Sequence, residues 1–243
     1  MVTAFYDVMN ESDTSGTYRS APETAGPWAA NLQHGGPPSA LLVHTAERVA
    51  AAATDRTDLI AMRYAAEFVG PVLVDVSLSS LDRDCLSARV WLVRDEDTSH
   101  IAAPDPAPAQ PFGDDLGMGF PYAEQLEWRV VHGGLRTLGP GEVWARPRGA
   151  LIDGRPLTGL QRAALIGDSA SGISSELDWN DWSFVNVDLD IHLARPMRGE
   201  WLHMDAVTQL GPNGSALARS TLSDTSGPLG ATLQTLVLAP IRR

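Results

Sequence analysis

The segment GGPPSALLVHTAERVAAAA, residues 35–53, decides how the first part of this chain is interpreted. It is rich in Ala and Leu, and it opens with two glycines and two prolines, which suit the first turn of a helix because proline loses no hydrogen bond there. The side chains of Leu41, Thr45 and Val49 recur at the spacing of one helical face. The segment therefore predicts a long helix.

Runs typical of β-strands flank this helix, and the same order of elements is then repeated. A segment dense in Pro and Gly, residues 95–122, separates the two cycles and has no period, which is typical of a linker. The predicted strands are residues 3–9, 17–21, 59–69, 72–81, 86–94, 126–131, 142–146, 183–193, 200–210, 217–223 and 231–238, and a second helix is predicted over residues 157–171.

Similar local sequences support a duplicated unit. LSARVWL at residues 86–92 resembles SALARSTL at residues 215–222, each in a predicted strand. Strands around one helix indicate an α+β layer architecture. This division predicts an N-terminal unit of residues 1–96, a linker of residues 97–125 and a C-terminal unit of residues 126–243.

Composition excludes several classes of function. The chain has 243 residues, 44% hydrophobic and 20% charged, with a formal net charge of −12, so nucleic acid and anionic membrane surfaces are poor partners. All 18 basic residues are Arg, which excludes a lysine Schiff base and a P-loop lysine. The single Cys85 cannot form an intramolecular disulfide or a multi-thiolate metal site. With no basic n-region at the start and no apolar run of about 18 residues, we expect a cytoplasmic protein.

GDSASG, residues 167–172, resembles the nucleophile elbow of serine hydrolases. The elbow requires glycine where this chain has Ser171, and it requires a strand-to-helix turn where a helix is predicted. The sequence therefore disfavours a Ser–His–Asp hydrolase.

A second motif lies in the predicted strand 183–193. Alternation would place Asn186, Asp188, Asp190 and His192 on one face, as a metal or acid–base cluster or as the solvated face of a half-buried strand. The solvated face is the favoured interpretation, because no other His, Asp or Glu group has a spacing that would complete a metal site.

Three further positions could carry chemistry. His34 precedes Gly35 and Gly36 at the predicted start of the first helix, where unpaired backbone N–H groups could bind a carbonyl or phosphate oxygen, or where glycine could simply ease the entry into the helix. Asp168 lies among small residues and could be a carboxylate facing a pocket. Gln234 lies in an apolar strand, so its amide needs hydrogen-bond partners.

Together these residues resemble the type II acyl-CoA thioesterases and their bacterial thioesterase-like relatives. The resemblance covers nearly the whole chain and rests on the order and spacing of five segments. The segments are NLQHGGPPSALLVHTAE (31–47), EFVGPV (67–72), GDSASG (167–172), NVDLDIHLARPMRGEWLHMDA (186–206) and GPLGATLQTLVL (227–238). The family fold is a double hotdog, so the resemblance implies an α+β chain of two tandem units, each a long helix wrapped by an antiparallel β-sheet.

The resemblance also implies a site and a mechanism. The family uses an Asp, a Thr and a Gln to activate one water, and these positions fall on Asp168, Asn186 and Gln234, with Asn in place of Thr. Asp168 would be the general base, while backbone N–H groups near Gly35 and Gly36 would polarise a thioester carbonyl. The implied substrate is an acyl-CoA or acyl-carrier thioester, with no covalent intermediate, no metal and no cofactor besides the coenzyme A of the substrate.

Two alternatives stay open. One is a non-catalytic acyl-thioester binding module, which Asn186 in place of Thr favours. The other is a hotdog hydratase or dehydratase with His34 as base, which the absence of a carboxylate in residues 28–33 disfavours. Since hotdog sheets often pair with another copy, a homo-oligomer is possible.

Overall fold

The computed structural model describes residues 5–25, 33, 36–54, 72–80, 83–92, 97–102, 111–114, 121–134, 137–151 and 156–241. The strand predicted at residues 59–69 and the residues His34 and Gly35 lie outside these ranges. The chain divides into two units, Met1–Glu96 and Asp97–Arg243.

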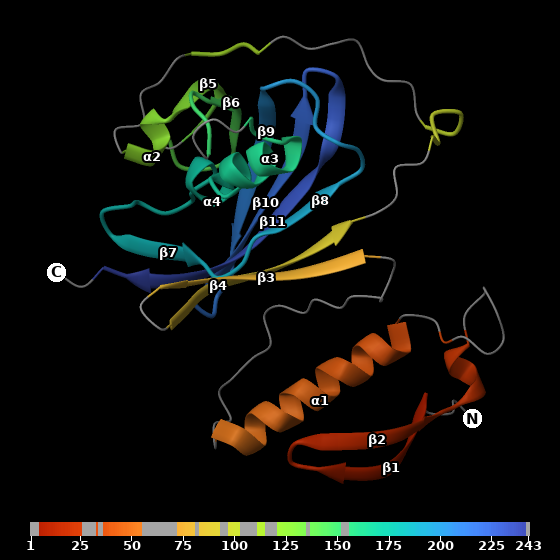
Figure 1. The fold of residues 1–243 in the computed structure, drawn as a ribbon. Coiled ribbons are helices and arrows are strands. Elements are labelled where there is room, and N and C mark those ends of the chain that lie inside the picture. The colour runs from red at the N-terminus through yellow and green to blue at the C-terminus, as the bar shows by residue number, and fades with distance from the viewer. Residues whose placement is uncertain are drawn as a thin grey trace. The chain divides into compact units, whose positions relative to one another are not determined.

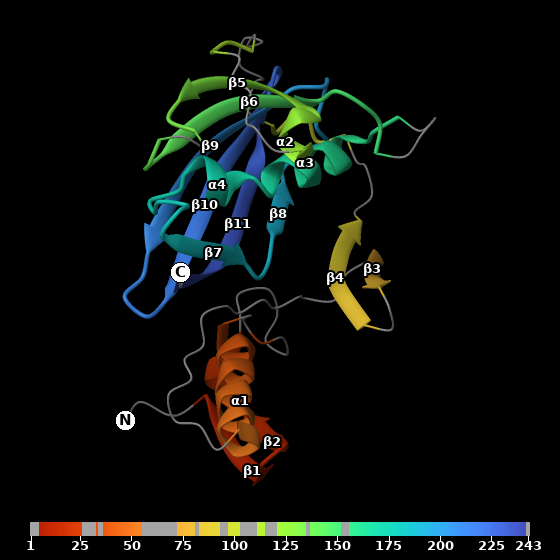
Figure 2. The ribbon, with the colours of Figure 1, turned by 90° about the vertical axis from the view of Figure 1, so that its left-hand side faces the viewer.

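In the N-terminal unit, β1 (Tyr6–Ser12) and β2 (Ser15–Ser20) form an antiparallel hairpin, followed by the short 3-10 helix η1 (Pro22–Thr24). The long helix α1 (Gly36–Thr54) confirms the helix predicted over residues 35–53. It lies along the hairpin in both views (Figures 1 and 2), where the guanidinium of Arg48 donates to the backbone oxygens of Ser12 and Ser15.

A second hairpin belongs to the same unit. β3 (Val72–Ser80) and β4 (Arg83–Leu92) pair antiparallel. Across the two strands, Arg89 Nε lies 2.6 Å from Asp75 Oδ1. Both strands were predicted, at residues 72–81 and 86–94, because their apolar runs end at polar turns.

One antiparallel sheet and three helices make up the described part of the C-terminal unit. Its elements are α2 (Pro121–Glu124), β5 (Leu126–His132), β6 (Gly141–Pro147), α3 (Gly159–Gly167), α4 (Ala170–Ile173), β7 (Trp182–Asn186), β8 (Asp190–Leu193), β9 (Leu202–Leu210), β10 (Ser215–Asp224) and β11 (Gly227–Pro240). The strand order is β5-β6-β9-β10-β11-β7, and β8 also pairs with β11. The strands of this sheet curl around α3 and α4, and this confirms the predicted α+β class.

The core of this unit lies between α3–α4 and the inner face of the curled sheet, as Figure 2 shows. Burial alternates along β10, where Ala218, Ser220 and Leu222 are buried and the residues between them are exposed. Opposite them, Ile166 and Ile173 of the two helices are fully buried. This alternation is the period-2 pattern that predicted the strand.

The second helix is interrupted, so the single helix predicted over residues 157–171 is wrong in that respect. α3 starts with a capping box, in which the Gln161 backbone N–H donates to Thr158 Oγ1 and the Gln161 side chain accepts from the Thr158 N–H. α3 ends at Gly167 with Asp168 as its C-cap, and α4 begins after Ser169, whose N–H donates to Ile166 O in a tighter turn. Asp and Ser favour such helix ends because their side chains compete for backbone hydrogen bonds.

One extra residue separates β7 from β8 where both pair with β11. Asn186 is opposite Leu236 and Asp190 is opposite Leu233, so three residues, 187–189, face only two residues of β11. Opposed residues in an antiparallel pair point to the same face. This bulge therefore puts Asn186 on the inner face with Leu236, which is 1% exposed, and Asp190 on the outer face with Leu233, which is 40% exposed.

The strand predicted as one element over residues 183–193 is thus wrong, and so is the single face predicted for Asn186, Asp188, Asp190 and His192. Period-2 alternation holds only while the register is continuous, and one inserted residue reverses it. The reversal lets Ile191 pack against the core although Asn186 also points inward.

A buried ion pair fixes the β10–β11 turn. Asp224 is fully buried, and its carboxylate accepts from both terminal nitrogens of Arg195, at 2.7 and 2.8 Å, and from the backbone N–H groups of Arg198 and Ser226. Burial opposes ionisation of Asp224, but these hydrogen bonds outweigh it and hold its pKa below the ordinary value. The sheet and the loop after β8 are thereby joined.

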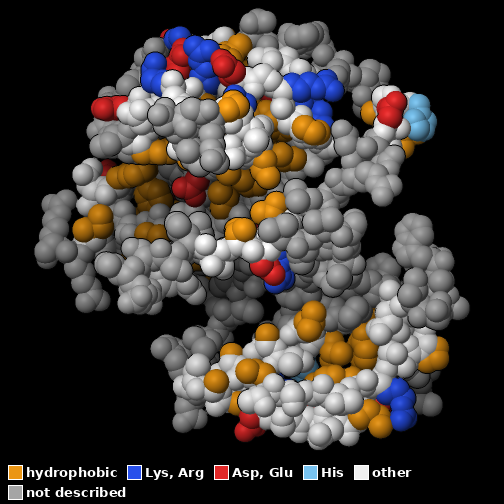
Figure 3. Space-filling model, in the orientation of Figure 1, with side chains coloured by type: hydrophobic (Ala, Val, Ile, Leu, Met, Phe, Trp, Pro, Cys, Tyr) orange, Lys and Arg blue, Asp and Glu red, His pale blue; other side chains and the backbone are white. Residues whose placement is uncertain are grey.

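Charged side chains gather on the outer face at β5 and β6 (Figure 3). There Glu127 lies between Arg129, at 2.7 Å, and Arg146, at 2.8 Å, and Arg146 also pairs with Glu200. No helix in the described part of the chain is long and apolar enough to cross a membrane.

Candidate functional site

Asp168 stands at the break between α3 and α4 in the C-terminal unit. It is the C-cap of α3, and its side chain is exposed. Because the helix stops there, its backbone oxygen is available to a side chain and accepts from Gln234 Nε2 at 3.0 Å. The helix break thus presents both the carboxylate and the carbonyl of one residue to the sheet.

Two amides from the sheet converge on the carboxylate of Asp168. Asn186 Nδ2 donates to Asp168 Oδ1 at 2.8 Å, and Gln234 Nε2 lies 3.3 Å from the same oxygen. Asn186 comes from the end of β7, and Gln234 comes from the middle of β11. Within the described ranges, no hydrogen bond reaches Asp168 Oδ2. The structure thus brings together the three residues predicted for the site.

Gln234 is held on both sides of its amide. Its Nε2 faces Asp168, while its Oε1 accepts the backbone N–H of Ser171 at 3.2 Å. The side chain is fully buried, and it lies opposite the buried Ala218 of β10. A buried amide with donor and acceptor both used has one orientation, so Gln234 ties the first turn of α4 to the sheet.

The amide of Asn186 is oriented by the carboxylate. Its Nδ2 also lies 3.4 Å from the backbone oxygen of Asp188, so both of its contacts with described residues use the donor side. The acceptor Oδ1 has no hydrogen bond to the residues that the structure describes. Asn186 therefore offers an acceptor beside a carboxylate.

Tyr122 of α2 lies at the opposite side of the helix break. Its hydroxyl donates to the backbone oxygen of Leu165 and lies 3.3 Å from Ser169 Oγ. Burial raises the pKa of Tyr122, and the negative charge of Asp168 raises it further against the opposing hydrogen bond with Ser169. The tyrosine thus stays neutral and holds the end of α3 in place.

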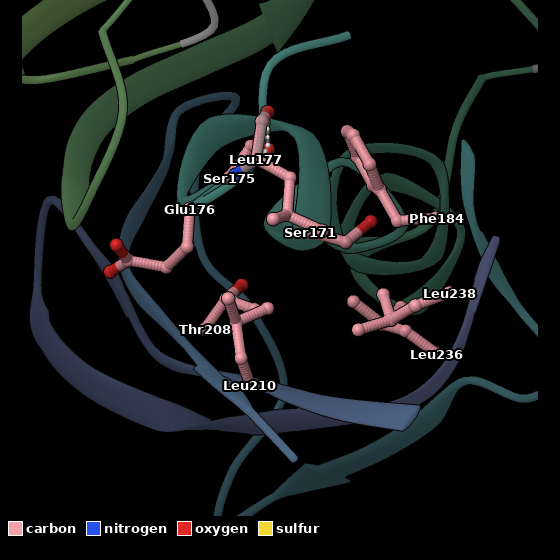
Figure 4. Close-up of a pocket in the computed structure, with 9 residues that line it drawn as sticks. All are labelled: Ser171, Ser175, Glu176, Leu177, Phe184, Thr208, Leu210, Leu236 and Leu238. Carbon is pink, nitrogen blue, oxygen red and sulfur yellow. Dashed lines mark hydrogen bonds between the residues drawn. The ribbon is translucent and has the colours of Figure 1, made fainter. Parts of the chain in front are cut away.

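A small hollow opens under α4, next to this cluster (Figure 4). Its volume is about 170 Å³, part of it open to solvent. Its walls are mostly apolar and come from α4, the segment after it, and β7, β9 and β11: Ser171, Ser175, Glu176, Leu177, Phe184, Thr208, Leu210, Leu236 and Leu238. Ser171 and Leu236 connect it to the site, since Ser171 is bonded to Gln234 and Leu236 is opposite Asn186.

The remaining sequence predictions concern a nucleophile elbow, a metal site and the start of the first helix. Among the described residues, Ser169 Oγ lies near the hydroxyl of Tyr122, and the backbone N–H of Ser171 donates to Gln234. The described residues contain no group of three His, Cys, Asp or Glu side chains arranged for a metal. Gly36 is the first residue of α1, and His34 and Gly35 lie outside the described ranges.

Asp188 is a residue whose role the sequence analysis missed. Its Oδ1 accepts the Thr235 backbone N–H at 2.6 Å, and its Oδ2 lies 3.1 Å from Thr235 Oγ1. The carboxylate is therefore engaged in the bulge and is not a merely solvated group. The only signal in the sequence was its position two residues after Asn186.

Comparison with known proteins follows the same division of the chain. Residues 24–94 match the family described as the acyl-CoA thioesterase N-terminal domain, and residues 97–238 match its C-terminal domain. No curated protein matches the chain.

Several solved structures have a similar fold. An acyl-CoA thioesterase II, TesB2, from Mycobacterium marinum shares 20% identity with a TM-score of 0.50, over 72% of this chain and 71% of that one. A conserved protein with a hot dog fold from Alicyclobacillus acidocaldarius shares 13% identity with a TM-score of 0.50, over 92% of both chains. The hotdog fold expected from the sequence is thereby confirmed.

Proposed function

Because the chain belongs to the acyl-CoA thioesterase family, we propose that it hydrolyses an acyl-CoA thioester with a water activated by Asp168. The observation that supports this most directly is the convergence of Asn186 and Gln234 on one exposed carboxylate. An exposed carboxylate with an unbonded oxygen can reach a water, while two fixed amides restrict its orientation.

In the proposed reaction, Asp168 takes a proton from the water as the water oxygen attacks the carbonyl carbon. Asn186 aligns the same water through its free acceptor Oδ1. The tetrahedral intermediate then collapses, the C–S bond breaks, and the thiolate takes up the proton. Because thiols have a pKa of about 8.5, the leaving group departs without help from a covalent nucleophile or a metal.

Both amides donate to Oδ1 of Asp168. This leaves Oδ2 as the proposed proton acceptor. The role proposed for His34, Gly35 and Gly36, to bind the thioester carbonyl through backbone amides, rests on the sequence alone.

We further propose that the acyl group enters the hollow under α4. The inner face of β11 carries Gln234, Leu236 and Leu238, which alternate with outward residues. An acyl chain that extends from Asp168 along this face would pass from the polar site to the apolar walls of the hollow. The hollow is small, since part of its volume of about 170 Å³ is open solvent, so we expect a preference for short acyl groups.

The test is release of free thiol from short, medium, long and aromatic acyl-CoAs by the wild type, Asp168→Asn and Asp205→Asn. Asp205 is an exposed aspartate of β9 in the same unit, so it controls for the loss of one charge. We expect Asp168→Asn to lower kcat by about 10²–10⁴-fold and Asp205→Asn to leave it unchanged. Equal activity of wild type and Asp168→Asn would refute the base.

The size of the acyl group is tested in the same assay with Phe184→Ala, which enlarges the hollow. We expect this variant to gain activity on longer acyl chains relative to the wild type. An unchanged chain-length profile would contradict the hollow as acyl site.

The alternative function is a non-catalytic binding module, which Asn186 in place of Thr favours. It is supported if no substrate is hydrolysed but acyl-CoA raises Tm. At an acyl-CoA concentration of 100 Kd, binding adds about 2.7 kcal/mol to the free energy of unfolding.

A further inference from the structure

The bulge between β7 and β8 is the feature that turns Asn186 toward Asp168. Without the extra residue, Asn186 and Ile191 would lie on opposite faces of the sheet, because they are five positions apart. With it, Asn186 faces inward and Ile191 packs against the core. The position of Asn186 therefore depends on whatever keeps the extra residue in place.

Thr235 of β11 is the residue that the bulge faces, and its backbone is bonded on both sides. Its oxygen accepts the N–H of Val187 at 2.9 Å, and its N–H donates to Asp188 Oδ1 at 2.6 Å. The side chain of Asp188 thus takes the place that a backbone carbonyl would have in a regular ladder. Its second oxygen, Oδ2, lies 3.1 Å from Thr235 Oγ1 and fixes the carboxylate at a second point.

These contacts reach the proposed site from two directions. Asp188 is two residues after Asn186, and its backbone oxygen lies 3.4 Å from Asn186 Nδ2. Thr235 directly follows Gln234, whose amide is bonded to Asp168. One carboxylate on the outer side of the bulge therefore sets the relative position of the two amides on its inner side.

We propose that Asp188 is a positioning residue that holds the bulge on Thr235 and so fixes Asn186 and Gln234 against Asp168. This rests on the proposed function, since it assigns Asp188 a part in the same site. Asp188 does not touch the reacting atoms. A regular strand that kept Ile191 in the core would place Asn186 on the outer face and leave Asp168 with one amide partner.

The test compares Asp188→Ala, Asp188→Asn and the control Asp205→Ala in thiol release. Asp188→Asn keeps an acceptor for the Thr235 N–H and places a donor opposite Thr235 Oγ1, which can accept, so both contacts can persist. We expect Asp188→Ala to lower kcat by at least about tenfold with KM within about threefold, since a displacement of about 1 Å at a site can cost 10²-fold. Asp188→Asn should retain kcat within about threefold.

A purely structural role is separated by combining Asp188→Ala with Asn186→Ala. Because Asp188 is proposed to act through Asn186 as well as Gln234, the loss of kcat in the double variant should be smaller than the product of the two single losses. Independent, multiplied losses would overturn the proposal, as would wild-type kcat in Asp188→Ala. Amide hydrogen exchange gives a readout without turnover, because the Thr235 N–H should lose protection in Asp188→Ala and keep it in Asp188→Asn.

Failure of the proposed function has a different signature. If the wild type releases no thiol from any acyl-CoA, the proposed function fails, and with it the catalytic part of Asp188. If the wild type is active and Asp168→Asn is not, yet Asp188→Ala retains both kcat and Thr235 protection, only the positioning role is refuted.

Discussion

Gln234→Glu would place a second carboxylate against Asp168 without a change of volume. The new oxygen would take the place of Nε2, which lies 3.3 Å from Asp168 Oδ1, while the other oxygen would still accept the N–H of Ser171. Two like charges at this distance repel by about 5 kcal/mol at an effective dielectric constant of 20 and by about 1.3 kcal/mol in bulk water. Since Gln234 is buried and Asp168 is exposed, the true value lies between these limits.

The repulsion raises the upper apparent pKa of the new carboxylate pair from the ordinary range near 4 to between about 5 and 8. A raised pKa in the folded state gives stability that is present at low pH and is lost as pH rises through that pKa. We therefore expect the variant to be close to the wild type at pH 5 and to lose about 1–5 kcal/mol by pH 8, which lowers Tm by roughly 3–20 °C.

Thermal unfolding at half-unit intervals between pH 5 and pH 8 measures this loss. Gln209→Glu is the matched control, because it adds the same charge at an exposed position of β9. The result that refutes the reasoning is a Tm difference from wild type that is the same at pH 5 and pH 8, or one that Gln209→Glu reproduces. If Asp168 is also the base, the rising limb of kcat/KM should move to higher pH in the variant.

Three further predictions concern the framework of the site. Arg195→Met leaves the carboxylate of Asp224 buried with backbone donors only, so it should cost about 3–5 kcal/mol in urea unfolding, and a loss under about 1 kcal/mol would contradict the buried pair. Because the pKa of Asp224 is lowered in the folded state, this carboxylate should stabilise the folded protein fully above about pH 4 and progressively less as pH falls through the folded pKa. Thermal unfolding of an Asp224→Asn variant should lack this acid-dependent loss of stability. Gly230→Ala should lower the free energy of unfolding by about 1–3 kcal/mol or more, because its Cβ would overlap the backbone oxygen of His192. Gly149→Ala, whose Cβ would meet open space, should change the free energy of unfolding by no more than about 0.5 kcal/mol.

Local patterns predicted most of the secondary structure of the described residues. The helix predicted over residues 35–53 is α1, and the strand predicted over residues 217–223 lies within β10. Propensity, proline at a helix start and period-2 alternation act over a few residues, so a sequence carries them without knowledge of the fold. The family resemblance added the expectation that Asp168, Asn186 and Gln234 belong to one site, and their catalytic role stays a prediction.

Only the tertiary structure decided how those three residues meet. Asp168 is 18 residues from Asn186 and 66 from Gln234, so their contacts depend on the register of β7 against β11. That register includes one extra residue in the bulge at Asp188, which reverses the faces of the strand after Asn186. The alternation of residues 183–193 cannot reveal that one residue is extra relative to β11. The hydrogen bonds that stabilise this extra residue come from Thr235, which lies in a distant part of the sequence. The sequence by itself thus determined which elements form, and the pairing of distant strands determined which side chains face Asp168.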